Sequence, residues 1–304
     1  MAEVDAYLRA RLRIAFEAAD HPLEWKGSTT GPCPGSDRVL LETHSFRSAG
    51  GDHVRGLLLR PIEDGGPKPA ILYIHAHGNA YDIGADELVW GRPALEGPLG
   101  PALAEAGQIV FCFDLPCFGT RSGETESAAA KAALWHGRSL AGRMMGELSS
   151  ALDWLERRED VDAARIGAFG ISMGATFGYW LAAIDPRIRA VAHFCCLSDF
   201  ARLIDLRAHD LHGIYLTVPG LIDLADNGTI AAMVAPRAQL AGIGDRDPLT
   251  PPAAADPALA RLRAGYGERG GELMVIREPE GGHAESPAMR DAVHTFFRRP
   301  LSRS

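Results

Sequence analysis

Apolar residues recur along the chain with two periods, one typical of helices and one typical of strands. A helix is predicted over residues 3–18, where apolar side chains follow helical spacing: Val4, Leu8, Leu12 and Ala15, with Tyr7 and Ile14 beside them. The next stretch, 21–37, is rich in Pro, Gly and Ser and predicts an extended connection. Residues 1–37 therefore look like an N-terminal helix and its connection to the rest of the chain.

Eight short apolar runs then have the length and composition of strands: 39–46, 54–60, 70–75, 109–114, 165–169, 190–194, 238–243 and 273–277. The first two flank a turn and predict an antiparallel pair. Helical patterns separate the others, at 101–106, 134–157, 257–264 and 288–297. This order predicts an α/β fold over residues 38–304, with a mainly parallel sheet of about eight strands and helices on both faces. The stretch 199–234 lies between two predicted strands and predicts a small lid.

The strongest candidate for chemistry is the pentapeptide Gly170-Ile171-Ser172-Met173-Gly174. An apolar strand-like run precedes it and a helix-like run follows it. A strand, a sharp turn with Ser at its tip and a helix form the setting of a nucleophile elbow, so Ser172 is the candidate nucleophile. The alternative is an ordinary Gly-rich turn in which the Ser hydroxyl caps a helix.

A serine hydroxyl needs a base to take its proton and an acid to orient that base. Among eleven histidines, His283 fits best, because it lies in a Gly-rich loop directly after the last predicted strand. For the acid, the loop after the 238–243 strand offers two aspartates. We favour Asp247, which sits further beyond the strand and is fixed by Pro248. Asp245 is the alternative, although it is better placed to cap the turn or pair with Arg246.

Acyl transfer also needs donors for the oxyanion that develops on the substrate. The backbone N–H of Met173, directly after the nucleophile, is one candidate. The other is the backbone N–H of His77, in the His75-Ala76-His77-Gly78-Asn79 loop after the 70–75 strand. Side chains that could touch the substrate are Trp90, His212 and Tyr215, for which packing within a loop or lid is the alternative.

Composition and charge argue against a nucleic-acid-binding protein, a membrane-spanning protein and a zinc-binding protein. At 304 residues, 46% apolar and 23% charged, the chain has ordinary globular values. Its net charge of −8, without a Lys/Arg cluster, argues against a nucleic-acid partner. The charged N-terminus and the lack of long apolar runs predict neither a signal peptide nor a membrane span, so we expect a cytoplasmic protein. The five cysteines show no zinc-binding spacing and are expected as free thiols.

Together these residues resemble the α/β-hydrolase superfamily, and within it the dienelactone-hydrolase-like and acetyl-xylan-esterase-like branch. The resemblance spans residues 39–297. Its marks include His75-Ala76-His77-Gly78, Asp114-Leu115-Pro116-Cys117-Phe118-Gly119, Val161-Asp162-Ala163-Ala164-Arg165-Ile166-Gly167, Asp185-Pro186-Arg187-Ile188 and Ala235-Pro236-Arg237. The order Ser172, Asp247, His283 is that of the superfamily. The chain departs from it at Ala76, where Gly is usual, and at Ser172, where dienelactone hydrolases carry Cys.

The resemblance implies a serine hydrolase that cleaves small carboxylic esters with short acyl groups through an acyl-enzyme. No metal or organic cofactor is expected. Two alternatives stay open: a peptidase or amidase of the prolyl-oligopeptidase-like type, and a non-catalytic binding protein on the same fold. The N-terminal helix is a candidate element for a homodimer.

Overall fold

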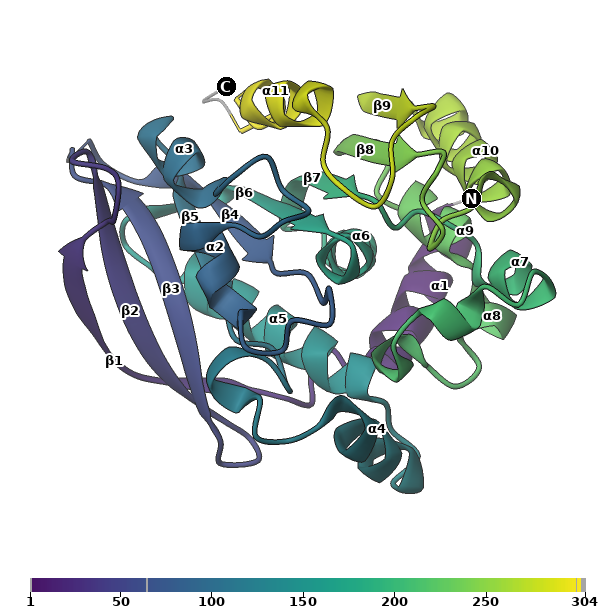
Figure 1. Cartoon of the computed structure of the whole chain (residues 1–304), viewed down its shortest axis with the longest axis horizontal. Helices are drawn as coiled ribbons and strands as arrows, with labels where there is room; N and C mark the ends of the chain where they lie inside the picture. Colours follow the sequence, from purple (N-terminus) through teal and green to yellow (C-terminus); the bar gives the residue numbers. More distant parts are fainter. Residues whose placement is uncertain (1, 64, 299, 302–304) are drawn as a thin grey trace.

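A nine-stranded sheet forms the centre of the molecule (Figure 1). The structure is a computed structural model, and it describes residues 2–63, 65–298, 300 and 301. The strand order is β1-β2-β3-β5-β4-β6-β7-β8-β9. The strands are β1 (Leu23–Pro32), β2 (Val39–Ser48), β3 (His53–Pro61), β4 (Lys68–Ile74), β5 (Ile109–Phe113), β6 (Val161–Ile171), β7 (Ile188–Phe194), β8 (Ala238–Gly244) and β9 (Leu273–Glu278). The pairs from β1 to β5 are antiparallel, and the pairs from β5 to β9 are parallel. The mainly parallel α/β sheet agrees with the fold class predicted from the sequence.

The edge strand β1 corrects the prediction for residues 21–37. We expected an extended connection there, but most of it pairs with β2, from Leu23 opposite Ser48 to Pro32 opposite Leu40. The sheet therefore has nine strands rather than eight. No alternating apolar pattern marks β1, because most of its side chains are exposed at the edge of the sheet. An edge strand gains its hydrogen bonds from one neighbour and needs no buried face.

Eleven α-helices occur in the described part of the chain. The longer ones are α1 (Ala2–Ala15), α4 (Glu126–Trp135), α5 (Leu140–Glu156), α6 (Met173–Ile184), α10 (Pro252–Arg269) and α11 (Pro287–Phe296). The shorter ones are α2 (Glu87–Trp90), α3 (Gly100–Glu105), α7 (Phe200–Asp205), α8 (Leu221–Leu224) and α9 (Asn227–Ala232). None of the described helices is both long and apolar enough to cross a lipid bilayer.

The helical region predicted at 134–157 begins too early, because it includes the end of α4, the non-helical residues 136–139 and then α5. Gly137 has a positive φ of 69°, a conformation that ends a helix readily only at glycine. Two residues later the Ser139 hydroxyl accepts a hydrogen bond from the N–H of Gly142 at 2.9 Å and caps the start of α5. The break therefore separates α4, which the sequence pattern did not predict, from α5.

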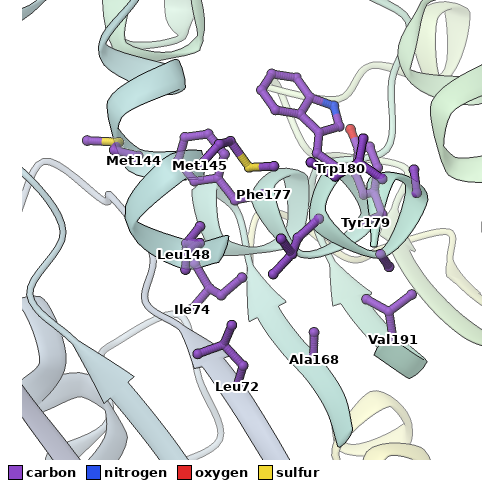
Figure 2. Close-up of a cluster of buried hydrophobic side chains, with 14 of the residues drawn as sticks. Leu72, Ile74, Met144, Met145, Leu148, Ala168, Phe177, Tyr179, Trp180 and Val191 are labelled. Carbon is purple, nitrogen blue, oxygen red and sulfur yellow. The ribbon is translucent and has the colours of Figure 1, made fainter. Parts of the chain in front are cut away.

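Side chains alternate between two layers of core on the two faces of the sheet. In β4, Leu72 and Ile74 join the layer under α1, α5, α6 and α10, whereas Ile71 and Tyr73 join the layer under α2, α3 and α11. Figure 2 shows part of the first layer, in which α6 lies over the strands and its Phe177 and Trp180 are on the side of the helix away from them. The buried α6 thus has a fixed position, which matters because it begins at the candidate nucleophile.

The stretch 199–234 carries α7, the 3₁₀ turns η3 (His209–Leu211) and η4 (Ile214–Leu216), α8 and α9. We call residues 199–234 the lid segment. Part of it belongs to the core, because Tyr215 and Leu221 are buried there. The N-terminal helix also packs into the same domain, where Phe16 just after α1 stacks on Trp180 with ring centroids 4.6 Å apart.

Candidate active site

Ser172 occupies a strained turn between β6 and α6. Its backbone has φ of 58° and ψ of −121°, outside the regions that L-residues favour. Its N–H donates to the carbonyl of Phe194 in β7 at 2.9 Å, which holds the turn. The flanking glycines are required because a methyl group on Gly174 would overlap the carbonyl of Ile74, and one on Gly170 would overlap Gly174. The turn therefore has the geometry of a nucleophile elbow.

A chain of hydrogen bonds links Ser172 to His283 and Asp247. The Nε2 atom of His283 lies 2.8 Å from Ser172 Oγ, and its Nδ1 atom lies 2.7 Å from Asp247 Oδ2. Because a carboxylate only accepts, Nδ1 donates its hydrogen to Asp247. That leaves Nε2 as the acceptor for the serine hydroxyl, which is the tautomer that a general base needs.

The two candidate aspartates have different partners. Asp247 is buried and accepts further hydrogen bonds from the N–H of Leu249 at 2.9 Å and the hydroxyl of Thr250 at 2.8 Å. Asp245 instead pairs with Arg277 of β9 at 2.6 Å. The loop placement favoured Asp247, and the structure puts Asp247 on the imidazole. The partner expected for Asp245 was Arg246, but Arg246 pairs with Glu280.

The loop after β4, residues 75–79, lies next to the elbow, because the carbonyl of Ile74 packs against Gly174. We call residues 75–79 the oxyanion loop. Within it, the N–H of Ala76 donates to Glu87 Oε2 at 2.9 Å, so that donor is already used. In the described part of the chain, the N–H of His77 has no acceptor. Met173 is the first residue of α6, where an N–H has no partner within the helix.

The buried ion pair of Glu87 and Arg92 contacts the oxyanion loop. Glu87 pairs with Arg92 at 2.5 Å and accepts from the Tyr73 hydroxyl at 2.9 Å. Arg92 in turn donates to the carbonyl of Ala76 at 3.0 Å. Both polar groups of the Ala76 backbone are therefore held by residues 87–92. Ala76 is not among the positive-φ residues of the described chain, so its backbone does not require glycine.

The loop that carries His283 is held by a second buried carboxylate. The N–H of Glu285 donates to the carbonyl of Ala94 at 2.8 Å, and its side chain accepts from the N–H of Glu96 at 3.0 Å. Glu285 also pairs with Arg290 at 2.5 Å, and Arg290 donates to the carbonyl of Gly97. Residues 87–97 thus contact both the oxyanion loop and the loop of the base.

His75 has a structural environment rather than a catalytic one. It is fully buried, its Nδ1 donates to the carbonyl of Ala76, and its Nε2 accepts from the N–H of Leu115. Burial lowers the pKa of His75 to about 4. The ring is therefore neutral at pH 7, and both of its nitrogens are occupied.

The three predicted substrate contacts differ in their surroundings. Trp90 ends α2 and is 66% exposed. His212 donates from Nε2 to the carbonyl of Leu249 at 2.9 Å, two residues after Asp247, and it borders a cavity of about 470 Å³ between α7, η4 and α8. Tyr215 is buried, and its ring stacks on His77 with centroids 4.9 Å apart. Contact with a substrate remains a prediction for all three residues.

Three carboxylates that support the site, Glu87, Glu126 and Glu285, were not identified from the sequence. Each is buried; Glu87 and Glu126 accept hydrogen bonds from the oxyanion loop, whereas Glu285 lies in the loop of His283 and accepts from the N–H of Glu96. No motif includes them, and a glutamate at the start of a helix such as α4 is ordinarily exposed. In the described residues, no group of three or more His, Cys, Asp or Glu side chains is placed to bind a metal ion.

Comparisons with known proteins point to hydrolases and esterases. Residues 98–214 match the model of the dienelactone hydrolase family. A protein of Bacillus subtilis (strain 168) named "Putative hydrolase YtaP" is 33% identical over 264 residues, covering 86% of this chain and 88% of that protein. Two acetyl xylan esterases share the fold. The enzyme of Paenibacillus sp. R4 has a TM-score of 0.68 and 17% identity, and that of Thermoanaerobacterium sp. JW/SL YS485 has a TM-score of 0.66 and 18% identity. Each comparison covers 98% of this chain and 94% of the esterase. With this relative, this family match and this fold, the chain belongs to the α/β-hydrolase superfamily, in its dienelactone-hydrolase-like branch.

Proposed function

We propose that this hydrolase cleaves carboxylic esters with short acyl groups through a serine-bound acyl-enzyme. The observation that carries the proposal is the continuous hydrogen-bonded chain from Ser172 through His283 to Asp247. Structures of the same fold are named acetyl xylan esterases and glucuronoyl esterases, which supports ester bonds as the target. The acetyl group in two of those names supports a short acyl chain.

In the first half of the reaction, His283 Nε2 takes the proton of the Ser172 hydroxyl while Oγ attacks the ester carbonyl carbon. Asp247 stabilises the resulting imidazolium. The carbonyl oxygen becomes an oxyanion, which the N–H groups of His77 and Met173 bind. The C–O bond to the alcohol then breaks, and the alcohol leaves with the proton from His283. The products of this half are the free alcohol and the acyl-enzyme.

In the second half, water takes the place of the alcohol. His283 accepts a proton from water, and the water oxygen attacks the acyl carbon. The same two N–H groups stabilise the second oxyanion. The bond to Ser172 Oγ breaks, Oγ recovers a proton from His283, and the carboxylic acid leaves. Each half-reaction returns His283 to the neutral tautomer described above.

Ser172→Ala tests this proposal. The change should lower turnover of p-nitrophenyl acetate and butyrate at least about 10³-fold, because the residual rate comes only from binding and the oxyanion donors. The variant should fold normally, since Ala removes one oxygen from a half-buried side chain. Circular dichroism and thermal unfolding check the fold.

Two substrate comparisons check the remaining alternatives. Wild-type protein should react with a fluorophosphonate and should cleave an ester much faster than the matched aminoacyl amide. A faster amide reaction would favour the peptidase alternative. A folded wild type that neither cleaves these esters nor reacts with the fluorophosphonate would favour a binding protein and would refute the proposed activity.

A further inference from the structure

Glu126, the first residue of α4, is a buried carboxylate that the proposed mechanism does not use. Three donors surround it. Its Oε2 atom accepts hydrogen bonds from Nε2 of His77 at 2.6 Å and from the hydroxyl of Tyr81 at 2.8 Å. Its Oε1 atom accepts from the backbone N–H of Tyr215 at 3.0 Å. One side chain therefore joins the oxyanion loop, the segment after it and the lid segment.

The ring of His77 is fixed at both nitrogens. Its Nδ1 atom accepts from the N–H of Asn79 at 3.0 Å, so Nε2 carries the hydrogen that goes to Glu126. Aromatic rings enclose it: Tyr215 stacks on it, while Phe118 and Tyr81 contact it edge-on, with centroids 5.2 and 5.1 Å away. The backbone N–H of the same residue is the second oxyanion donor of the proposed reaction. The hydrogen bond from the Asn79 N–H ties this ring to the backbone of the oxyanion loop, so a displaced ring would disturb the backbone that presents that donor.

We propose that Glu126 is a positioning residue that aims the His77 N–H at the oxyanion and fixes the lid segment beside it. The proposal rests on the proposed function, because it assigns a role to one of the oxyanion donors. It adds a residue from α4, a helix that contributes nothing to the nucleophile, the base or the acid.

A carboxylate suits this position better than any neutral group of the same size. Burial alone would raise the pKa of Glu126, but hydrogen bonds from His77, Tyr81 and Tyr215 outweigh that effect and lower the pKa below its ordinary value. The group is therefore ionised at pH 7 and accepts at both oxygens, and such charge-assisted hydrogen bonds are about twice as strong as neutral ones. Glutamine has one acceptor oxygen, and its NH₂ group would face a donor at the other.

Glu126→Gln is the test, because it keeps the volume and removes the second acceptor. The rate of reaction with a fluorophosphonate, whose phosphoryl oxygen needs the same donors, should fall about 10- to 100-fold. That range lies below the 10²- to 10³-fold loss expected when a donor is removed completely. For p-nitrophenyl acetate, kcat should fall by a similar factor while KM changes less than about 3-fold. Rates are normalised to the folded fraction.

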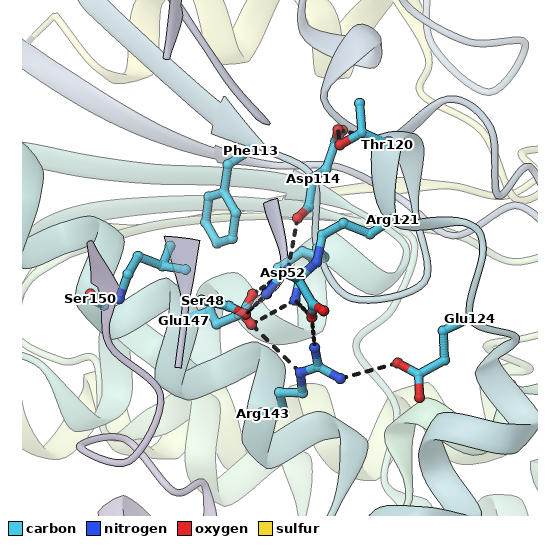
Figure 3. A network of polar contacts seen from close by, with 12 residues as sticks. Ser48, Asp52, Phe113, Asp114, Thr120, Arg121, Glu124, Arg143, Glu147 and Ser150 are labelled. Carbon is cyan, nitrogen blue, oxygen red and sulfur yellow. Dashed lines mark hydrogen bonds and ion pairs between the residues drawn. The ribbon is translucent and has the colours of Figure 1, made fainter. Parts of the chain in front are cut away.

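Glu147→Gln is the matched control. Glu147 is also a buried glutamate, in α5, and it pairs with Arg121 at 2.5 Å in the network shown in Figure 3. It contacts none of the candidate active-site residues. This control should lower thermal stability but leave the fluorophosphonate rate per folded molecule within about 2-fold of wild type. A merely structural role for Glu126 would give the same pattern.

The outcomes separate the two proposals. A folded Glu126→Gln variant that reacts within about 2-fold of wild type overturns the positioning role and leaves the ester hydrolase proposal standing. A wild type without any fluorophosphonate or ester reaction overturns both. If Glu126→Gln does not fold, Tyr81→Phe removes one donor from the same carboxylate. It should slow the fluorophosphonate reaction about 3- to 10-fold, and an unchanged rate contradicts the positioning role.

Discussion

Asp245 and Asp247 lie two residues apart in one loop, and their surroundings separate their roles. Asp247 is buried and accepts hydrogen bonds from His283, Leu249 and Thr250. Asp245 is tied to Arg277 on the neighbouring strand. At the scale of the residue, the candidate acid is the carboxylate that the loop buries against the imidazole.

The first residue-scale prediction follows from this difference. Asp247→Asn should leave His283 in the wrong tautomer, because an amide NH₂ would face Nδ1, and should lower kcat for p-nitrophenyl acetate by up to about 10⁴-fold. Asp245→Asn is the control and should change kcat less than about 3-fold, since it weakens only an exposed ion pair. Equal losses in the two variants would contradict the assignment of the acid.

How far the candidate site could be predicted from sequence depends on where each residue lies. Ser172 directly follows β6, while Asp247 and His283 lie in the loops after β8 and β9, so the strand pattern predicts all three at one edge of the sheet. Glu126 and Glu285 act through contacts between loops far apart in the chain, with 49 residues separating Glu126 from His77. A single sequence carries no signal for such pairs, because their partners depend on the path of each loop.

At the scale of the element, the missed features are those without an apolar period. The polar edge strand β1 gains its stability from hydrogen bonds to β2, which leave no pattern in its own sequence. The break between α4 and α5 depends on the backbone of Gly137 and the cap at Ser139. Periodicity predicted one helix over residues 134–157, without the break at 136–139 and without residues 126–133 of α4.

The first helix supplies the element-scale prediction, because α1 and the turn after it pack on α6, the helix that begins at the nucleophile. Phe16 is fully buried against Trp180, whereas Ile14 is 74% exposed. Phe16→Ala should lower the free energy of unfolding by about 3–5 kcal/mol through lost burial and the cavity left behind. Ile14→Ala should change it by less than about 0.5 kcal/mol. Urea unfolding measures both, and similar values would contradict the packing of this segment.

At the scale of the whole molecule, several buried histidines link stability to pH. Burial lowers the pKa of His75 to about 4 and that of His193 to about 3. Burial also lowers the pKa of His212 and His294. In the unfolded chain each would titrate near 6.5. Glu87 acts in the opposite sense, because burial raises its pKa and the folded state holds its proton more tightly.

Between pH 4 and 6.5 the unfolded chain therefore binds more protons at these histidines than the folded protein does, so stability must rise with pH. Each extra proton that the unfolded chain binds makes the free energy of unfolding change by about 1.4 kcal/mol per pH unit. His75 and His193 each supply up to one such proton, and Glu87 offsets at most one. We expect the free energy of unfolding in urea to fall by about 1–2.5 kcal/mol between pH 6 and pH 5. His193→Asn, a smaller side chain without that titration, should show a shallower slope than wild type even if its stability at pH 7 is lower. A flat or inverted wild-type slope would mean that these histidines are protonated in the folded protein, against the burial that surrounds them.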